Sequence, residues 1–333
     1  MTRGQFFQAY KWPIVVLTIA LFKLVSHGTV HLQLPSKVQD FVTLSLSVFV
    51  EAFPFLILGS LLAAAVTVFV PKGFFESRLP KNSLPRRFSL SFLGFLFPVC
   101  ECGNVPLSRS LLLQGLRPSE AVTFLLAAPV LNPITIWSTW SAFSSDSKIV
   151  VARILSTLVI ANAIGYIVAQ HPKESELLTS SFARVCLDHN VRKNSTFTRS
   201  ARLIQFSDAF RHEAAIMMKM LAFGALVAGI VQSFIPRELL IGIGSNPVLS
   251  IVTMLSLAFV VSICANVDAF FALSFATTFT PGSIVSFLVF GPMIDIKMLA
   301  LLKTTFRTEF LVAVTLLALF MSGMAGLVVA YAF

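Results

Sequence analysis

The sequence has few charged residues and few cysteines. Of its 333 residues only 12% are Asp, Glu, Lys or Arg, whereas 56% are hydrophobic, and the mean hydropathy is +0.86. Soluble domains contain about 45–50% apolar residues, so a water-soluble fold of this length would leave the excess exposed. The four cysteines are too few for a disulfide scaffold, and we interpret them as thiols.

The chain also lacks the short motifs of several enzyme classes. It has no Gly-x-x-x-x-Gly-Lys-Ser/Thr loop for a nucleotide and no His-Glu-x-x-His helix for zinc. Cys102 beside Glu101 would offer a nucleophile to an intramembrane enzyme, but no histidine lies in an apolar run near it. We therefore predict that the protein is not an enzyme and uses no cofactor, with intramembrane catalysis kept as an alternative.

Long apolar runs dominate instead. Stretches such as 52–70, 239–267 and 310–333 carry no charged residue and are long enough to cross roughly 30 Å of hydrocarbon as helices. The sequence therefore predicts an all-α, polytopic integral membrane protein of the bacterial inner membrane. The expected membrane segments are 12–30, 41–70, 88–115, 118–143, 149–170, 213–236, 247–279, 281–302 and 309–333.

Two parts of the chain resemble each other. A shift of 162 positions pairs Cys102 with Cys264 and Asn104 with Asn266, and neighbouring shifts pair glycines and prolines in the same order. Chance similarity between apolar segments does not readily explain this order. Four regions are expected: an extra transmembrane helix in 1–40, a first membrane repeat in 41–170, a mobile cytoplasmic linker in 171–212 and a second membrane repeat in 213–333.

The distribution of basic residues predicts the orientation of these repeats. Segments 72–87 and 171–212 are rich in Lys and Arg, which collect in cytoplasmic loops. We therefore attribute the formal charge of +10 to topology and expect the lipid bilayer, not nucleic acid, as partner. This assignment gives the repeats inverted topology, as in many secondary transporters. Nine full crossings would contradict it, so 118–143 and 281–302 are expected to be broken or re-entrant helices.

The densest group of chemically useful residues interrupts an apolar segment. Two thiols and an amide follow one another at 100–104, and Cys264 and Asn266 occupy the related positions of the second half. Soft thiolates suit soft metals and metalloids, so Cys100, Cys102 and Cys264 are candidate ligands for a transported metal or metalloid. The alternative is that the cysteines are small core residues and that Glu101 pairs with Arg109. The candidate substrate-binding residues are Cys100, Cys102, Gly103, Asn104, Pro106, Asn132, Pro133, Cys264 and Asn266.

Acidic residues inside apolar runs are candidates for proton coupling, because ionisable side chains are expensive within a membrane. They are Glu51, Glu101, Asp268 and Asp295. Asp295 could instead pair with Lys297, Glu51 could lie at the interface, and Asn132 could cap a hairpin tip. Cys186, in the polar linker, is interpreted as incidental.

These motifs resemble those of a known family. The run Pro98-Val99-Cys100-Glu101-Cys102-Gly103-Asn104-Val105-Pro106, followed by Pro129-Val130-Leu131-Asn132-Pro133, is similar to the predicted permeases that include YraQ and the organoarsenical efflux permease ArsP. The resemblance covers about 41–333. It implies a multi-span permease and, for ArsP-type members, thiol-dependent efflux of trivalent organoarsenicals. Zinc is the rival solute, and a non-transporting membrane subunit of a complex is the rival class.

Overall fold

The computed structural model describes residues 36–71, 74–97, 99–144, 147–192, 199–234, 247–276 and 278–332. The predicted first helix at 12–30 lies outside them. The chain divides into two units, 1–40 and 41–333. In the first unit only residues 36–40, the start of one helix, are described. Every other described helix belongs to the second unit.

The first half of the chain consists of helices of very different length. The long ones are apolar, whereas those near the predicted motifs have only 4 to 13 residues. They are α2 (Ser36–Phe69), α3 (Phe74–Arg78), α4 (Ser83–Ser91), α5 (Leu93–Leu96), α6 (Glu101–Leu113), α7 (Pro118–Ala127), α8 (Pro133–Ala142) and α9 (Ser147–Ala169).

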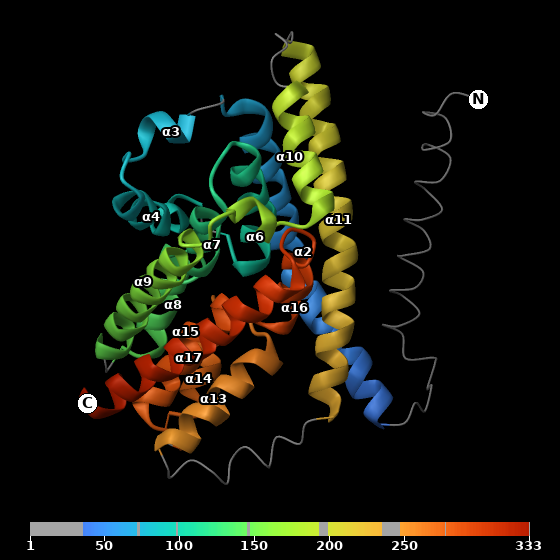
Figure 1. The fold of residues 1–333 in the computed structure, drawn as a ribbon. Helices are drawn as coiled ribbons and strands as arrows, with labels where there is room; N and C mark the ends of the chain where they lie inside the picture. Colours follow the sequence, from blue (N-terminus) through green and yellow to red (C-terminus); the bar gives the residue numbers. More distant parts are fainter. Residues whose placement is uncertain are drawn as a thin grey trace. The chain divides into compact units, whose positions relative to one another are not determined.

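The second half also begins and ends with a long helix and has shorter helices between them (Figure 1). A 3₁₀ turn, η1 (Glu174–Leu177), and α10 (Ser180–Arg192) connect the halves. The remaining helices are α11 (Arg199–Phe234), α13 (Pro247–Val261), α14 (Asp268–Leu273), α15 (Pro281–Met293), α16 (Ile296–Leu302) and α17 (Thr308–Ala332).

The all-helical, multi-pass membrane class is confirmed. The described residues form no strand, only an isolated bridge between Leu178 and Phe306. Five helical runs are long and apolar enough to cross a membrane: Val38–Phe69, Ser147–Ala169, Arg202–Ser233, Pro281–Leu302 and Thr308–Ala332.

Several predicted spans are interrupted, and the sequence explains where. Proline is the first residue of α7, α8 and α15, where its missing N–H costs nothing and its fixed φ favours a helix start. Pro133 thus divides segment 118–143 into α7 and α8, whereas segment 281–302 divides into α15 and α16 just after Pro292, where Asp295 caps α16. The breaks predicted in both segments are therefore present.

The polar segment 171–212 is more ordered than the sequence predicts. We expected a mobile linker, but α10 is helical and α11 runs unbroken from Arg199 into the membrane segment. The reason is hydrophobic burial: the side chains of Leu177, Leu178 and Phe182 lie in the main hydrophobic core. Their burial fixes this part of the segment against the membrane helices.

Helices of the two halves pack across each other. α7 packs on α9 and α15 packs on α17, the corresponding pairs within each half. Between the halves, α6 packs against α16 and α14 packs against α8. These cross-contacts bring the short helices with the predicted motifs to one place (Figure 1).

One helix crossing predicts a measurable effect on stability. A Cβ atom at Gly59 of α2 would overlap the backbone of Gly103 in α6, so Gly59→Ala should force the two helices apart. We expect a loss of about 1–3 kcal/mol, as for an overpacked core. Gly323→Ala in α17 is the matched control, because its Cβ would meet side-chain atoms of Leu255 and Ile251 at ordinary distances of 3.5 and 3.9 Å. Thermal unfolding in detergent compares them, and equal stability of both variants would contradict the close crossing.

Candidate functional site

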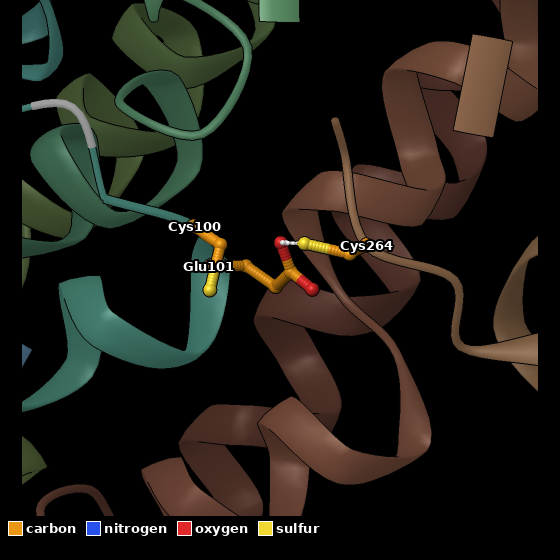
Figure 2. A group of neighbouring side chains, drawn as sticks. All are labelled: Cys100, Glu101 and Cys264. Atoms are coloured by element: carbon orange, nitrogen blue, oxygen red, sulfur yellow. Dashed lines mark hydrogen bonds between the residues drawn. The ribbon is translucent and has the colours of Figure 1, made fainter. Parts of the chain in front are cut away.

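The two halves meet at a group of two thiols and a carboxylate. Cys100 is the N-cap of α6 and Glu101 its first residue, while Cys264 precedes α14. The Sγ atoms of Cys100 and Cys264 and a carboxylate oxygen of Glu101 all lie within 4.8 Å of one another (Figure 2). The Cys264 thiol points at Glu101 Oε2, 3.6 Å away. The structure thus brings the interrupted segments around Cys100 and Cys264 together, and we call these three residues the thiol–carboxylate group.

A buried lysine completes the charge pattern around this group. Lys297 Nζ lies 3.0 Å from Glu101 Oε1 and 3.6 Å from Asp295 Oδ2. It also donates to the carbonyl of Ser262 at 2.7 Å. Ser262 has a φ of +51°, a left-handed conformation that costs a non-glycine residue about 1–3 kcal/mol and that concentrates at functional sites. One ammonium thus faces two carboxylates, leaving a formal charge of −1.

A second ion pair joins the halves beside the first. Arg153 of α9 binds Asp268, the first residue of α14, through two hydrogen bonds of 2.6 and 3.0 Å. The same guanidinium donates to Thr139 of α8 at 2.7 Å. Both side chains of the ion pair are 2% exposed, so water contributes little to their solvation. This pair is neutral and bidentate, which fixes the start of α14 against α8 and α9.

The two predicted turn residues cap helices. The Asn132 side chain accepts from the backbone N–H of Ile134, and Asp295 accepts from that of Met298. Asn132 also donates to the carbonyl of Val99, 3.2 Å away, just before the thiol–carboxylate group. The capping alternative for Asn132 is therefore confirmed, as is the pairing of Asp295 with Lys297.

Asn104 and Asn266 differ in the hydrogen bonds that their side-chain amides make. Asn266 accepts a hydrogen bond from Thr135 at 3.0 Å. Asn104, on the first turn of α6, is fully buried, and neither atom of its amide has a partner among the described residues. An unpaired buried amide is costly and calls for a ligand, ion or water. Gly103 beside it permits the close crossing with α2, and Pro106 lies further along the same helix.

Cys102 and Glu51 remain candidates, whereas one sequence-based pairing is wrong. Cys102 is fully buried in the same core and its thiol lies within hydrogen-bonding reach of Cys100, but it is not among the three ligand atoms that lie within 4.8 Å of one another. Glu51 lies half-buried on α2, and among the described residues no hydrogen bond or ion pair connects it to the group. The alternative pairing of Glu101 with Arg109 is wrong, because Lys297 is closer in space and occupies Glu101. Pro133 is the first residue of α8 and supports its start.

Arg109 instead connects four elements at the linker end of α6. Its guanidinium binds Glu213 of α11 at 2.7 Å and the hydroxyls of Thr304 and Thr305 at 3.1 and 3.0 Å. It also lies over the ring of Phe182 in α10, 4.4 Å from its centroid. A cavity of about 380 Å³ opens beside it. Its lining includes Ala63, Pro106, Arg109, Phe182, His212 and Glu213.

The two basic residues of the site, Arg153 and Lys297, could have been recognised from the sequence. Arg153 and Lys297 each stand inside an apolar segment, 149–170 and 281–302. Charged residues at such positions usually pair with one another or mark a pathway. The rule that singled out the acids applies equally to these two bases, but the sequence-based prediction considered only Lys297, as an alternative partner of Asp295, and named neither base as a site residue. The structure places both next to predicted acids.

Comparison with known proteins agrees with this architecture. A family model described as a predicted permease matches residues 37–331. The chain belongs to this predicted permease family. It is 33% identical over 282 residues to the Streptococcus mutans protein named "Putative two-component membrane permease complex subunit", covering 84% of this chain and 91% of that protein.

A second relative is the UPF0718 protein YcgR of Bacillus subtilis, 35% identical over 268 residues, or 80% of this chain and 88% of that protein. A Methanocaldococcus jannaschii protein is 27% identical over 100 residues, 30% of this chain and 27% of that protein. No solved structure matches the chain. The predicted membership of a permease family is thus confirmed.

Proposed function

We propose that the protein is a secondary permease of the bacterial inner membrane that exports a small thiophilic solute, such as a trivalent organoarsenical or a related metalloid. The observation that carries the proposal is the thiol–carboxylate group, in which both halves contribute a sulfur within 4.8 Å of the same carboxylate. A site built from both halves can bind a solute in one arrangement of the halves and release it in another. Soft sulfur ligands select soft solutes.

The charges around the group favour a cationic or proton-exchanging occupant. Glu101 and Asp295 share one ammonium, so the ionised site carries a formal charge of −1 before anything binds. A buried uncompensated charge is unfavourable, which gives a soft cation or a proton a reason to enter. We assign proton exchange to Glu101 and Asp295, with Asp268 held in its own ion pair and Glu51 left as a separate candidate on α2.

Reciprocal contacts support two repeats related by a two-fold axis. α6 packs on α16 while α14 packs on α8, the exchange of partners that a two-fold relation produces. Each of α6 and α14 also begins with an acid that pairs with a base of the opposite half. With the charge distribution of the sequence, this supports the inverted topology that many secondary transporters share.

The cavity beside Arg109 is our candidate for the access route from the linker side. Helix α6 carries Glu101 at its start and lines the cavity with Pro106 and Arg109. At a rise of about 1.5 Å per residue, Glu101 and Arg109 lie about 12 Å apart along the helix axis. The solute would need to travel only this distance, and α10 with Phe182 would cover the entrance.

Two observations favour other functions in the same fold. The carboxylate in the thiol–carboxylate group suits zinc, which accepts sulfur and oxygen together, so a zinc permease is the second candidate. The name of the Streptococcus mutans relative mentions a complex subunit, so a second membrane or soluble subunit is a candidate partner and a subunit without transport activity is the third candidate.

Flux through the purified protein separates these functions. In proteoliposomes with a proton gradient we expect accumulation of trivalent methylarsenic, and no ATP requirement. Accumulation of zinc alone would favour the zinc permease. A folded, monodisperse protein that moves neither solute would contradict the transport proposal and favour a subunit role.

Cysteine labelling in whole cells tests the orientation. We expect the linker 171–212 in the cytoplasm and Phe333 outside, because basic residues concentrate in the linker. An impermeant thiol reagent should modify a cysteine placed at residue 333 but not the natural Cys186 of α10. Labelling of Cys186 without lysis would show the opposite orientation, with a detergent-permeabilised sample as the control for reactivity.

A further inference from the structure

A second cavity, separate from the thiol–carboxylate group, opens on the outer surface of the helices. It has a volume of about 410 Å³ and lies between α11, α16 and α17, with Phe259 of α13 at its wall. Its lining is almost entirely apolar and includes Phe223, Val227, Leu299, Leu311, Val312 and Leu316. Phe223, Val312 and Leu316 are each more than half exposed, and the first belongs to α11 and the other two to α17, both able to span the membrane. Such a surface faces lipid chains.

One end of this groove is cationic. Lys303, at the C-terminal end of α16, belongs to the lining and is exposed. Lys219 precedes Phe223 by one turn on the same face of α11 and is exposed too. Among the described residues, all ion pairs involve other side chains. Glu309 lies in the first turn of α17, so the immediate surroundings keep a net positive charge.

The two lysines lie at a similar level, because the contacts between α11 and α16 run in opposite sequence directions. A Cβ at Gly224 would lie 3.1 Å from Lys297 Cα and from Ala300 Cβ. Further toward the linker, Arg109 bridges Glu213 of α11 and Thr304 beyond α16. Lys303 therefore comes level with the turn of α11 just before Gly224, where Lys219 lies.

This cationic end lies where a lipid headgroup would be. The turn after Lys303 is hydrogen-bonded to the polar segment between the halves, through Thr179 N–H to the Thr305 carbonyl and Arg307 N–H to that of Leu177. From Lys219 to Val227 the groove follows α11 for about 12 Å at 1.5 Å per residue. One leaflet of the hydrocarbon core is about 15 Å thick, so the apolar part matches the depth of one acyl chain.

We propose that this groove binds one anionic phospholipid, with its phosphate at Lys219 and Lys303 and an acyl chain along Phe223, Val227 and Leu316. Two ammonium groups attract a headgroup with net negative charge and disfavour one that also carries a choline cation. The bound lipid stabilises the position of α16, the helix that carries Lys297, which pairs with Glu101. Lipid binding is measured without transport, so its test does not depend on which solute the protein carries.

Native mass spectrometry of the purified full-length chain tests the site. With dioleoylphosphatidylglycerol as the probe we expect one retained lipid, and much weaker retention of dioleoylphosphatidylcholine. Each lysine contributes about fivefold near an anionic headgroup, so Lys219→Gln with Lys303→Gln should weaken phosphatidylglycerol binding about thirtyfold. Lys81→Gln with Lys173→Gln, two exposed lysines outside the groove, should leave binding unchanged.

A second variant tests the apolar part. Leu316→Trp fills the groove without changing any charge and should also weaken phosphatidylglycerol binding. Equal retention of the two lipids, or an unchanged affinity in the Lys219→Gln and Lys303→Gln double variant, would mean that only ordinary annular lipid surrounds the helices and would overturn the proposal.

Discussion

Lys297→Met should abolish transport and lower the stability of the protein more than any other single substitution in the site. The change keeps the length of the side chain but leaves Glu101 and Asp295, each 1% exposed, without their shared cation. Removing one partner of a buried ion pair costs about 3–5 kcal/mol, because the remaining charge stays buried. Thermal unfolding in detergent and flux in proteoliposomes measure the two effects.

Two further variants separate charge from packing. Glu101→Gln combined with Lys297→Met removes both charges, so we expect part of the stability to return while transport stays absent. Lys173→Met is the matched control, because Lys173 pairs with Glu176 on the surface at 3.2 Å and exposed pairs contribute little. A Lys297→Met protein as stable as wild type would show that Lys297 is not the counter-charge of these acids.

Cys100→Ser and Cys264→Ser should each reduce flux of a thiophilic solute at least about tenfold while the protein still folds. Serine keeps the volume of the side chain nearly constant but replaces soft sulfur by harder oxygen. Substitutions that only support a metal-binding site already cost 10- to 100-fold, so the loss of a ligand should cost no less. Flux of trivalent methylarsenic, arsenite and zinc, each normalised to the amount of folded protein, gives the comparison.

Two cysteines serve as controls for this experiment. Cys102 is as buried as Cys100 and its thiol lies within hydrogen-bonding reach of Cys100, but it is not one of the three ligand atoms of the thiol–carboxylate group. Cys186 lies on α10 and is only partly buried. Both Cys102→Ser and Cys186→Ser should retain flux. Loss of flux in Cys102→Ser alone would place the site elsewhere on α6, and full activity in Cys100→Ser and Cys264→Ser would favour a packing role for these thiols.

Much of the fold could be predicted from the sequence, because hydrophobic run length and proline position are local properties. Pro133 begins α8 at the break within 118–143, and Pro292 lies just before the break within 281–302. The ordered part of 171–212 could not be predicted, since its order depends on the burial of Phe182 and its contact with Arg109. That contact exists only once four distant elements are packed together.

The candidate site could also be predicted only in part from the sequence. Cys100, Glu101 and Cys264 could be singled out because thiols and acids are conspicuous in apolar runs, and the repeat pairing brought the two halves together. The basic partners of Glu101 and Asp268 could not be identified from the sequence, since Lys297 lies 196 positions from Glu101 and Arg153 lies 115 positions from Asp268. For the same reason the repeat shift favoured Cys102 as the equivalent of Cys264, whereas the fold brings Cys100 to it.

X-ray absorption spectroscopy of the purified, zinc-loaded protein tests most directly whether both halves share one thiol site. We predict two sulfur neighbours at about 2.3 Å and oxygen neighbours at about 2.0–2.2 Å in the wild type, with one sulfur neighbour remaining in Cys100→Ser or Cys264→Ser and two in Cys102→Ser. A bound ion surrounded by oxygen and nitrogen alone, or a sulfur count unchanged by Cys264→Ser, would contradict a site formed by Cys100, Glu101 and Cys264.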